Sequence, residues 1–196
     1  MAEKKDLTFR TAKPKERAYP IFDDKVTFQP LAFADMPLMF QWFNKPHVQQ
    51  FYSLRSWTID EVRDKLAPYI LGEKPVFGFI IYLNKSPIGY IQTYRISDYP
   101  WPEQNFSEDI IQSAAGVDLF VGEEHYLQQG LGVQIMQAFL NQYIWSRFHY
   151  CIVDPDIHNL SAIRCYEKLH FIPHRVINTS DALGRAVQLQ LMILRI

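Results

Sequence analysis

The sequence predicts a mixed α/β domain with a central, mostly antiparallel and twisted sheet flanked by helices. Three observations support this prediction. Apolar stretches in the first half of the chain follow one another across short turns, which is typical of antiparallel hairpins. Apolar stretches in the second half alternate with helical patterns, which is typical of parallel crossovers. The length of 196 residues is enough for one domain with a sizeable core.

The first elements follow a segment with little periodicity. Residues 1–25 carry alternating charges, so we expect an N-terminal extension, and residues 26–196 are expected to form the domain. A strand is predicted over 26–31. A helix is predicted to begin at Asp35, because apolar residues recur at helical spacing from there to Phe43.

A second helix and a hairpin complete the first half of the predicted domain. Thr58 and Glu61 match a capping-box pattern, which predicts a helix from there to about Leu71. Two apolar stretches, 77–83 and 87–94, are separated by a short polar turn. They are expected to pair as antiparallel strands.

The second half contains a long loop and then alternating strands and helices. The loop is acidic and aromatic, and a loop of this size in a compact domain is more often functional than filler. The expected elements are a loop over 97–114, a strand over 115–121, a helix from 133 to about 143, a strand over 150–155, a helix over 161–169, and strands near 171–177 and 186–195.

Composition excludes several classes of protein. The formal net charge of −1 offers no basic surface for nucleic acid. The charged start lacks the apolar core of a signal peptide, and no apolar run approaches the roughly 18 residues of a membrane helix. Two cysteines, Cys151 and Cys165, make neither a disulfide framework nor a metal set. We therefore expect a cytoplasmic protein with no metal, no nucleic-acid partner and no membrane association.

A glycine turn before a predicted helix is a candidate anion site. Gly130 and Gly132 follow a strand and open the helix, so main-chain N–H groups can approach a pyrophosphate there. The turn does not match a dinucleotide-binding fingerprint, which needs a third glycine and a later acidic residue. It also lacks the Lys-Ser/Thr pair of a P-loop, so a different phosphate-bearing ligand is indicated.

The segment 154–171 narrows the identity of this phosphate-bearing ligand. It contains Asn159, Ala162 and Tyr166 at the spacing of a motif, Asn-x-x-Ala-x-x-x-Tyr-x-x-x-Gly-Phe, that follows the glycine turn in GNAT acyltransferases. The chain therefore resembles the GNAT superfamily of acyl-coenzyme A N-acyltransferases. The resemblance implies the GNAT fold and acetyl-coenzyme A as the acyl donor.

The resemblance also implies roles for individual residues. The glycine turn would hold the pyrophosphate, the preceding strand would pair with the pantetheine arm, and Asn159 would bond that arm from the other side. Tyr166 would protonate the departing thiolate. The implied cofactor-binding residues are Phe120, Val121, Gly122, Leu127, Gln128, Gln129, Gly130, Leu131, Gly132, Val133 and Asn159.

Two positions depart from the superfamily pattern. Leu127 stands where Arg or Gln is common, so main-chain contacts to the pyrophosphate would have to dominate. His170 stands where glycine usually accepts a left-handed helix cap. A histidine in that conformation costs about 1 kcal/mol.

Within the superfamily, the chain is similar to the aminoglycoside 6'-N-acetyltransferases. The similarity lies in Trp42-Phe43-Asn44-Lys45-Pro46-His47, in 87–94, in Gly116-Val117-Asp118, and in Asp154-Pro155 with 162–168. It implies a small, polycationic acceptor that is acetylated directly in a ternary complex. Asp118 and Asp154 would lie at the acceptor amine. The implied substrate-binding residues are Gln92, Trp101, Glu108 and Asp109.

The chemistry of amine acetylation supports the same two carboxylates. An ammonium group must lose a proton before it can attack a thioester, and a nearby carboxylate can accept that proton directly or through water. Asp118 lies on the strand that leads into the glycine turn, and Asp154 ends the neighbouring predicted strand. We expect the two to converge. Together, Asp118, Asp154 and Tyr166 are the predicted catalytic residues.

Three alternatives remain open from the sequence. Siderophore-biosynthesis acyltransferases, which act on a hydroxylated lysine, share several motifs but tend to have His where Asp118 stands. A non-catalytic coenzyme A-binding module would use the same fold, although it would have no need for Asp118 or Tyr166. A protein N-acetyltransferase would need an open groove for an extended peptide, whereas the acidic-aromatic loop suits a compact polyamine better. The sequence is compatible with a monomer or a homodimer.

Overall fold

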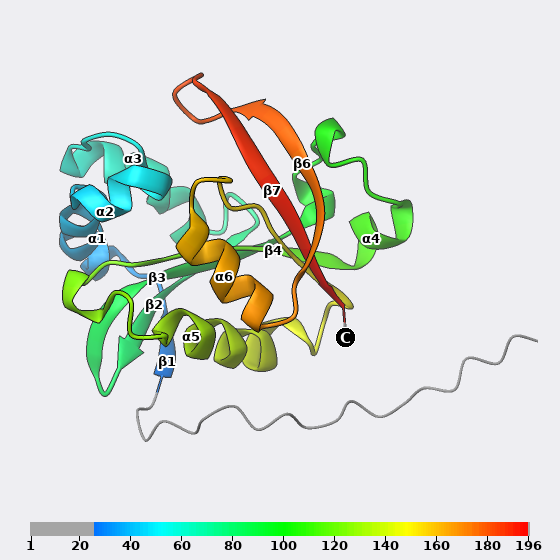
Figure 1. Cartoon of the computed structure of the whole chain (residues 1–196). Helices are drawn as coiled ribbons and strands as arrows, with labels where there is room; N and C mark the ends of the chain where they lie inside the picture. The colour runs from blue at the N-terminus through cyan, green and yellow to red at the C-terminus, as the bar shows by residue number, and fades with distance from the viewer. Residues whose placement is uncertain (1–25, 196) are drawn as a thin grey trace, which may run out of the picture.

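The computed structural model describes residues 26–195, and its centre is a seven-stranded sheet in the order β1-β2-β3-β4-β5-β7-β6 (Figure 1). Neighbouring strands are antiparallel except for β4 and β5, which are parallel. The predicted mixed and mostly antiparallel sheet is therefore confirmed. The strands are β1 (Val26–Pro30), β2 (Val76–Leu83), β3 (Ser86–Arg95), β4 (Ala114–Val121), β5 (Tyr150–Val153), β6 (Ile172–Ser180) and β7 (Ala186–Arg195).

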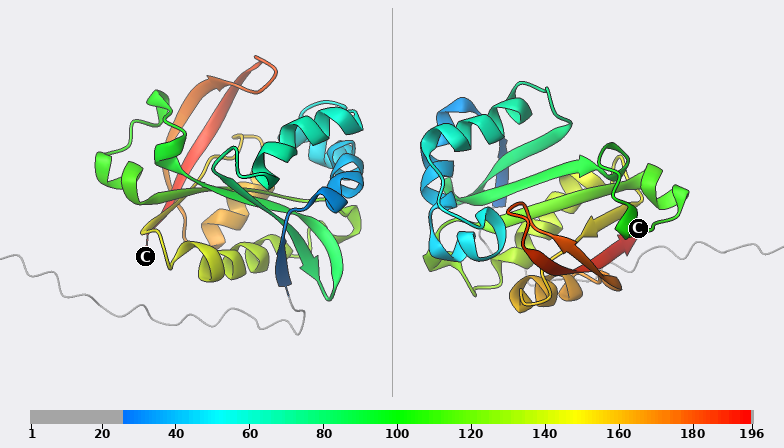
Figure 2. Two further views of the ribbon diagram at one scale, coloured as in Figure 1. Left: turned by 180° about the vertical axis from the view of Figure 1, so that it is seen from behind. Right: turned by 90° about the horizontal axis from the view of Figure 1, so that it is seen from above.

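Helices cover both faces of this sheet (Figure 2). Successive side chains of a strand point to opposite faces, so Ile80 and Phe120 pack under α1, α2 and α3, whereas Phe79 and Ile81 pack against α5. Two apolar cores result, one on each face. The helices are α1 (Met36–Phe43), α2 (Pro46–Val48), α3 (Ile59–Ile70), α4 (Glu108–Ser113), α5 (Leu131–Phe139) and α6 (Leu160–Lys168).

Local signals in the sequence located two helix ends correctly. The Thr58 hydroxyl accepts from the Glu61 N–H at 3.3 Å, and the Glu61 carboxylate accepts from the Thr58 N–H at 2.7 Å, so the predicted capping box opens α3. His170 has a φ of 69° after α6, which confirms the predicted left-handed cap. The expected extension, residues 1–25, lies outside the described residues.

The structure differs from the predicted elements at three places. The segment expected as a loop contains two 3-10 turns, Ile96–Asp98 and Pro102–Gln104, as well as helix α4. A π-helical turn, Gln49–Ser53, follows α2 and was not anticipated. Only the α5 crossover joins neighbouring parallel strands, because β7 inserts between β5 and β6 and pairs with both.

The parallel pair at the centre of the sheet separates early. β4 and β5 pair only from Ala114 with Tyr150 to Gly116 with Ile152. β4 then continues to Val121 with β3 as its partner. The two strands therefore part beyond Gly116 and leave one edge of β4 unpaired next to the start of α5 and α6.

Candidate active site

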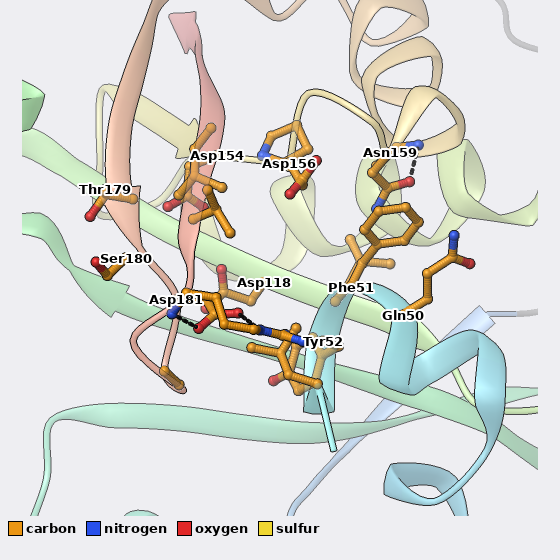
Figure 3. Close-up of a pocket in the computed structure, with 18 of the residues that line it drawn as sticks. Gln50, Phe51, Tyr52, Asp118, Asp154, Asp156, Asn159, Thr179, Ser180 and Asp181 are labelled. Atoms are coloured by element: carbon orange, nitrogen blue, oxygen red, sulfur yellow. Dashed lines mark hydrogen bonds and ion pairs between the residues drawn. The ribbon is translucent and has the colours of Figure 1, made fainter. Parts of the chain in front are cut away.

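A cleft of about 590 Å³ lies where β4 and β5 part (Figure 3). Its floor is β4, and its walls come from the end of β5 with α6, from the π-helical turn 49–53 with α3, and from the tip of the β6–β7 hairpin. Segments far apart in the sequence thus meet at one place. The predicted site residues that line this cleft are Gln92, Trp101, Asp118, Asp154, Asn159 and Tyr166.

Asp118 projects from β4 into the cleft (Figure 3). Its cross-strand partner is Gln92 on β3, whose Nε2 donates to Asp118 Oδ2 at 2.8 Å. Burial raises the pKa of Asp118, while the hydrogen bond from Gln92 and the charge of Lys65 oppose that rise. The result is a carboxyl group that is oriented by its neighbour and poised to bind a proton.

Asp154 follows β5 and lines the same cleft. Burial, and next the negative charge of Asp118, raise the pKa of Asp154 to about 8. Because two carboxylates in one desolvated cleft resist ionising together, the pair titrates as a unit. The predicted convergence of the two acids is present in the structure.

Tyr166 lies on α6 and lines the cleft. The side-chain oxygen of Asn159 accepts from the Ala162 N–H at 3.1 Å and caps the start of this helix. Tyr166 is buried and packs on Phe171, and burial raises its pKa well above the ordinary value. The phenol is therefore neutral and holds its proton.

The glycine turn has the geometry of an anion site. Gly130 has a φ of 77° and is the N-cap of α5, a conformation that suits glycine. A Cβ at Gly132 would lie 3.1 Å from Cys165 Sγ, so a residue without a side chain lets α5 and α6 approach closely. Val133 N–H donates to Gly130 O at 3.2 Å, and the N–H groups before it stand at the start of α5, where a helix leaves its first N–H groups without helical partners.

The register of β4 differs from the expected pantetheine contacts. Gly122 N–H donates to Ile88 O at 2.7 Å, and hydrogen-bonded pairs recur at every second residue of an antiparallel ladder. The main chain of Phe120 therefore faces β3, and its side chain is buried in the core. The main-chain groups that face the unpaired edge are those of Val121, which was among the expected residues, and of Leu119, which was not.

The motif 42–47 anchors the end of β4. The Trp42 indole and the Lys45 ammonium donate to the two oxygens of Glu123, at 2.7 and 2.8 Å. His47 Nε2 lies 3.1 Å from the Val121 carbonyl oxygen. These contacts join α1 and α2 to the strand that floors the cleft, so the motif positions the site from outside it.

Two predicted substrate residues do not line the cleft. Glu108 and Asp109 are exposed on α4. Glu108 accepts from Gln112 at 2.8 Å, and Asp109 accepts from the Tyr150 hydroxyl at 3.1 Å. The structure therefore brings Gln92 and Trp101 to the cleft, but not these two carboxylates.

Sequence reasoning missed several residues of the cleft wall. Most of them have no motif spacing, because they come from segments that reach the cleft only through the tertiary fold. Asp156 is the exception, since it lies in the segment 154–171. The one local signal is aromatic: Phe51 and Tyr52 stand between the first two predicted helices, in a short stretch without a structural assignment. The missed residues include Gln50, Phe51, Tyr52, Lys65, Asp156, Asp181 and Arg185.

The fold and the cleft define an acyltransferase of the GNAT type. The sequence profile of the family described as "Acetyltransferase (GNAT) domain" matches residues 32–179, and the chain belongs to this family. Within the described residues, 26–195, no helix is long and apolar enough to cross a membrane. That part of the chain also contains no group of three or more His, Cys, Asp or Glu residues suited to a metal ion.

Individual relatives point in the same direction. The aminoglycoside N(6')-acetyltransferase type 1 of Klebsiella pneumoniae is 28% identical over 165 residues, which are 81% of this chain and 80% of the relative. Crystal structures of aminoglycoside acetyltransferase AAC(6')-Ib, one with coenzyme A and one with coenzyme A and kanamycin, are also similar to the chain. Each shows a TM-score of 0.73 and 25% identity, over 87% of this chain and 95% of the other.

Proposed function

We propose that this chain transfers the acetyl group of acetyl-coenzyme A to a primary amine of a small cationic acceptor, the 6'-amine of an aminoglycoside. The observation that supports this most is the meeting of Asp118, Asp154 and Tyr166 in one cleft, at the point where β4 and β5 part. Two groups that can accept a proton and one that can donate it thus share one cleft, which supports acyl transfer to an amine.

The described residues fit coenzyme A at the parted strands. The glycine turn would hold the pyrophosphate through the N–H groups at the start of α5 and the left-handed conformation of Gly130. Leu119 and the N–H of Val121 would pair with the pantetheine arm along the unpaired edge of β4. The Asn159 side-chain NH₂ would donate from the other side. Acetyl-coenzyme A, when bound, supplies the acetyl group as an activated thioester.

The remaining residues of the site would handle the protons. The Asp118–Asp154 pair would take a proton from the acceptor ammonium, because the raised pKa values make the pair a stronger base than an exposed carboxylate. Gln92 would keep Asp118 in place. Tyr166, whose proton is retained by burial, would protonate the leaving thiolate. Transfer would be direct, with no covalent intermediate on the protein.

The identity of the acceptor rests on the relatives and on the cleft. The Klebsiella relative is named an aminoglycoside N(6')-acetyltransferase, and one structural relative was solved with kanamycin. The cleft of about 590 Å³ is a compact pocket of the kind that small molecules use. A hydroxylated lysine as acceptor, a binding-only module and a protein substrate gain no support from these relatives.

A thiol-release assay tests the proposal. The purified chain is incubated with acetyl-coenzyme A and kanamycin, tobramycin, spermidine or an N-hydroxylated lysine. We expect coenzyme A release that depends on the aminoglycoside and exceeds that with the other amines. Release that no amino sugar raises above background hydrolysis would contradict the proposal.

A further inference from the structure

A lysine, Lys65, stands among the acids of the cleft. Lys65 lies on α3, one turn after the buried Val62, so its side chain lies on the inward flank of the helix. It lines the cleft and also a smaller adjoining cavity of about 140 Å³. Its Nζ lies 5.8 Å from the centre of the Trp57 ring, which forms part of that second cavity. The Lys65 ammonium is therefore held at the junction of the two cavities.

Lys65 and Asp118 are within electrostatic reach of each other. Burial lowers the pKa of Lys65, and the attraction of Asp118 opposes that change. The same attraction lowers the pKa of Asp118 against the effect of burial. The carboxylate that would meet the acceptor amine thus already has a cationic neighbour from the protein.

The other charges of the cleft are largely balanced as well. Asp181 accepts from Arg185 Nε at 2.7 Å and from two main-chain N–H groups of its own hairpin, so its charge is satisfied within the hairpin. The ionisation of Asp154 is opposed by burial and by Asp118. The fourth aspartate, Asp156, accepts from the His158 main-chain N–H at 2.8 Å, and the cations Lys65 and Arg185 make the cleft less negative than its four aspartates alone would.

We propose that Lys65 is a specificity-determining residue, whose ammonium repels additional ammonium groups of the acceptor and donates to a hydroxyl or carboxylate oxygen in their place. The preferred acceptor is then an amino sugar with few ammonium groups, and acceptors with many are tolerated less well. An ammonium has three donors and no acceptor, so it matches an oxygen and cannot pair with a second cation. The inference rests on the proposed amine acetylation and narrows its acceptor class.

The test compares three side chains at one position. Lys65→Gln removes the charge and Lys65→Arg keeps it. Lys85→Gln, an exposed residue in the turn between β2 and β3, is the matched control for loss of one positive charge. Acceptors are kanamycin, which has several amines, and 6-amino-6-deoxyglucose, which has one. The readouts are the KM of each acceptor and its Kd by calorimetry without acetyl-coenzyme A.

We expect Lys65→Gln to lower the KM and Kd of kanamycin at least about fivefold, because a like charge is removed from a partly desolvated cleft. The single-amine sugar should change less than about twofold. Lys65→Arg, Lys85→Gln and the KM for acetyl-coenzyme A should stay near wild type.

Two results would overturn the inference. One is unchanged or weaker kanamycin binding in Lys65→Gln. The other is an equal shift in the Gln and Arg variants, which would assign the effect to packing. The calorimetric comparison needs no turnover. Failure of the wild type to acetylate any amine would therefore reject the proposed function, and the binding data would still decide the role of Lys65.

Discussion

The Gln92 side-chain amide donates to Asp118 Oδ2 at 2.8 Å across the β3–β4 pair. Its carbonyl oxygen accepts from the Tyr90 hydroxyl at 3.0 Å, which fixes the direction of the amide. One oxygen of Asp118 is therefore held by the side chain of a residue on the neighbouring strand. Asp118 is the residue whose role can be tested most sharply, because its orientation does not depend on a mobile side chain.

Asp118→Asn should lower kcat about 100-fold or more, because the amide cannot accept the acceptor's proton. The measurement is thiol release at saturating acetyl-coenzyme A. Asp109→Asn, an exposed change on α4 outside the cleft, should have little effect. A loss below about threefold in Asp118→Asn would reassign this residue to substrate positioning.

The pH dependence should report the pair of acids. The base must be ionised, so kcat/KM should be low in acid and rise with pH through the apparent pKa of the pair, about 8 for Asp154. Asp154→Asn removes the group whose ionisation is opposed by burial and by Asp118, so the rise should then follow Asp118 alone. The rising limb should move to lower pH by about one unit. A pH profile that stays in place, or moves to higher pH, would show that Asp118 and Asp154 do not titrate as a pair.

Tyr166→Phe should lower kcat by about tenfold or more and leave both KM values within about threefold of wild type. A proton donor to the thiolate acts in the transition state, whereas a binding group acts in both states. The measurement is steady-state kinetics over both substrates. Equal kcat values in wild type and variant would show that Tyr166 takes no part in the mechanism.

Two glycines with the same backbone conformation offer a matched test of the proposed pyrophosphate contact at the glycine turn. Gly130 and Gly184 have φ values of 77° and 76°, and a Cβ at either would meet nothing within 4 Å. Changing each to Ala should cost about 1 kcal/mol of stability. Only Gly130→Ala should also weaken the Kd of acetyl-coenzyme A, by about fivefold or more. Equal affinities in the two variants would place the pyrophosphate elsewhere.

Local chemistry made much of the fold predictable. The capping box at Thr58 and Glu61 and the left-handed cap at His170 depend on residues within one turn, and both were recognised from the sequence. We could predict that Asp118 and Asp154 lie close together, because Asp154 follows the end of the strand next to the one that carries Asp118. Such features follow from short-range spacing and strand order alone.

The wall of the cleft that comes from α3, the π-helical turn and the β6–β7 hairpin was not predictable in the same way. Tyr52 reaches it through a π-helical turn, and Asp181 reaches it at the tip of a hairpin that overhangs the sheet. Lys65 lies on a helix that was predicted from its capping box, a signal that says nothing about which residues face the cleft. These residues meet because of how α3 and the β6–β7 hairpin pack around β4, which no local pattern specifies.

The most direct test of the whole account is the structure of the product. Kanamycin and acetyl-coenzyme A are incubated with the chain, and the product is examined by mass spectrometry and NMR. The proposed function predicts one added acetyl group, on the 6'-amine, with one coenzyme A thiol released per product. Unmodified kanamycin alongside an enzyme that binds acetyl-coenzyme A, or acetylation at a different amine, would contradict it.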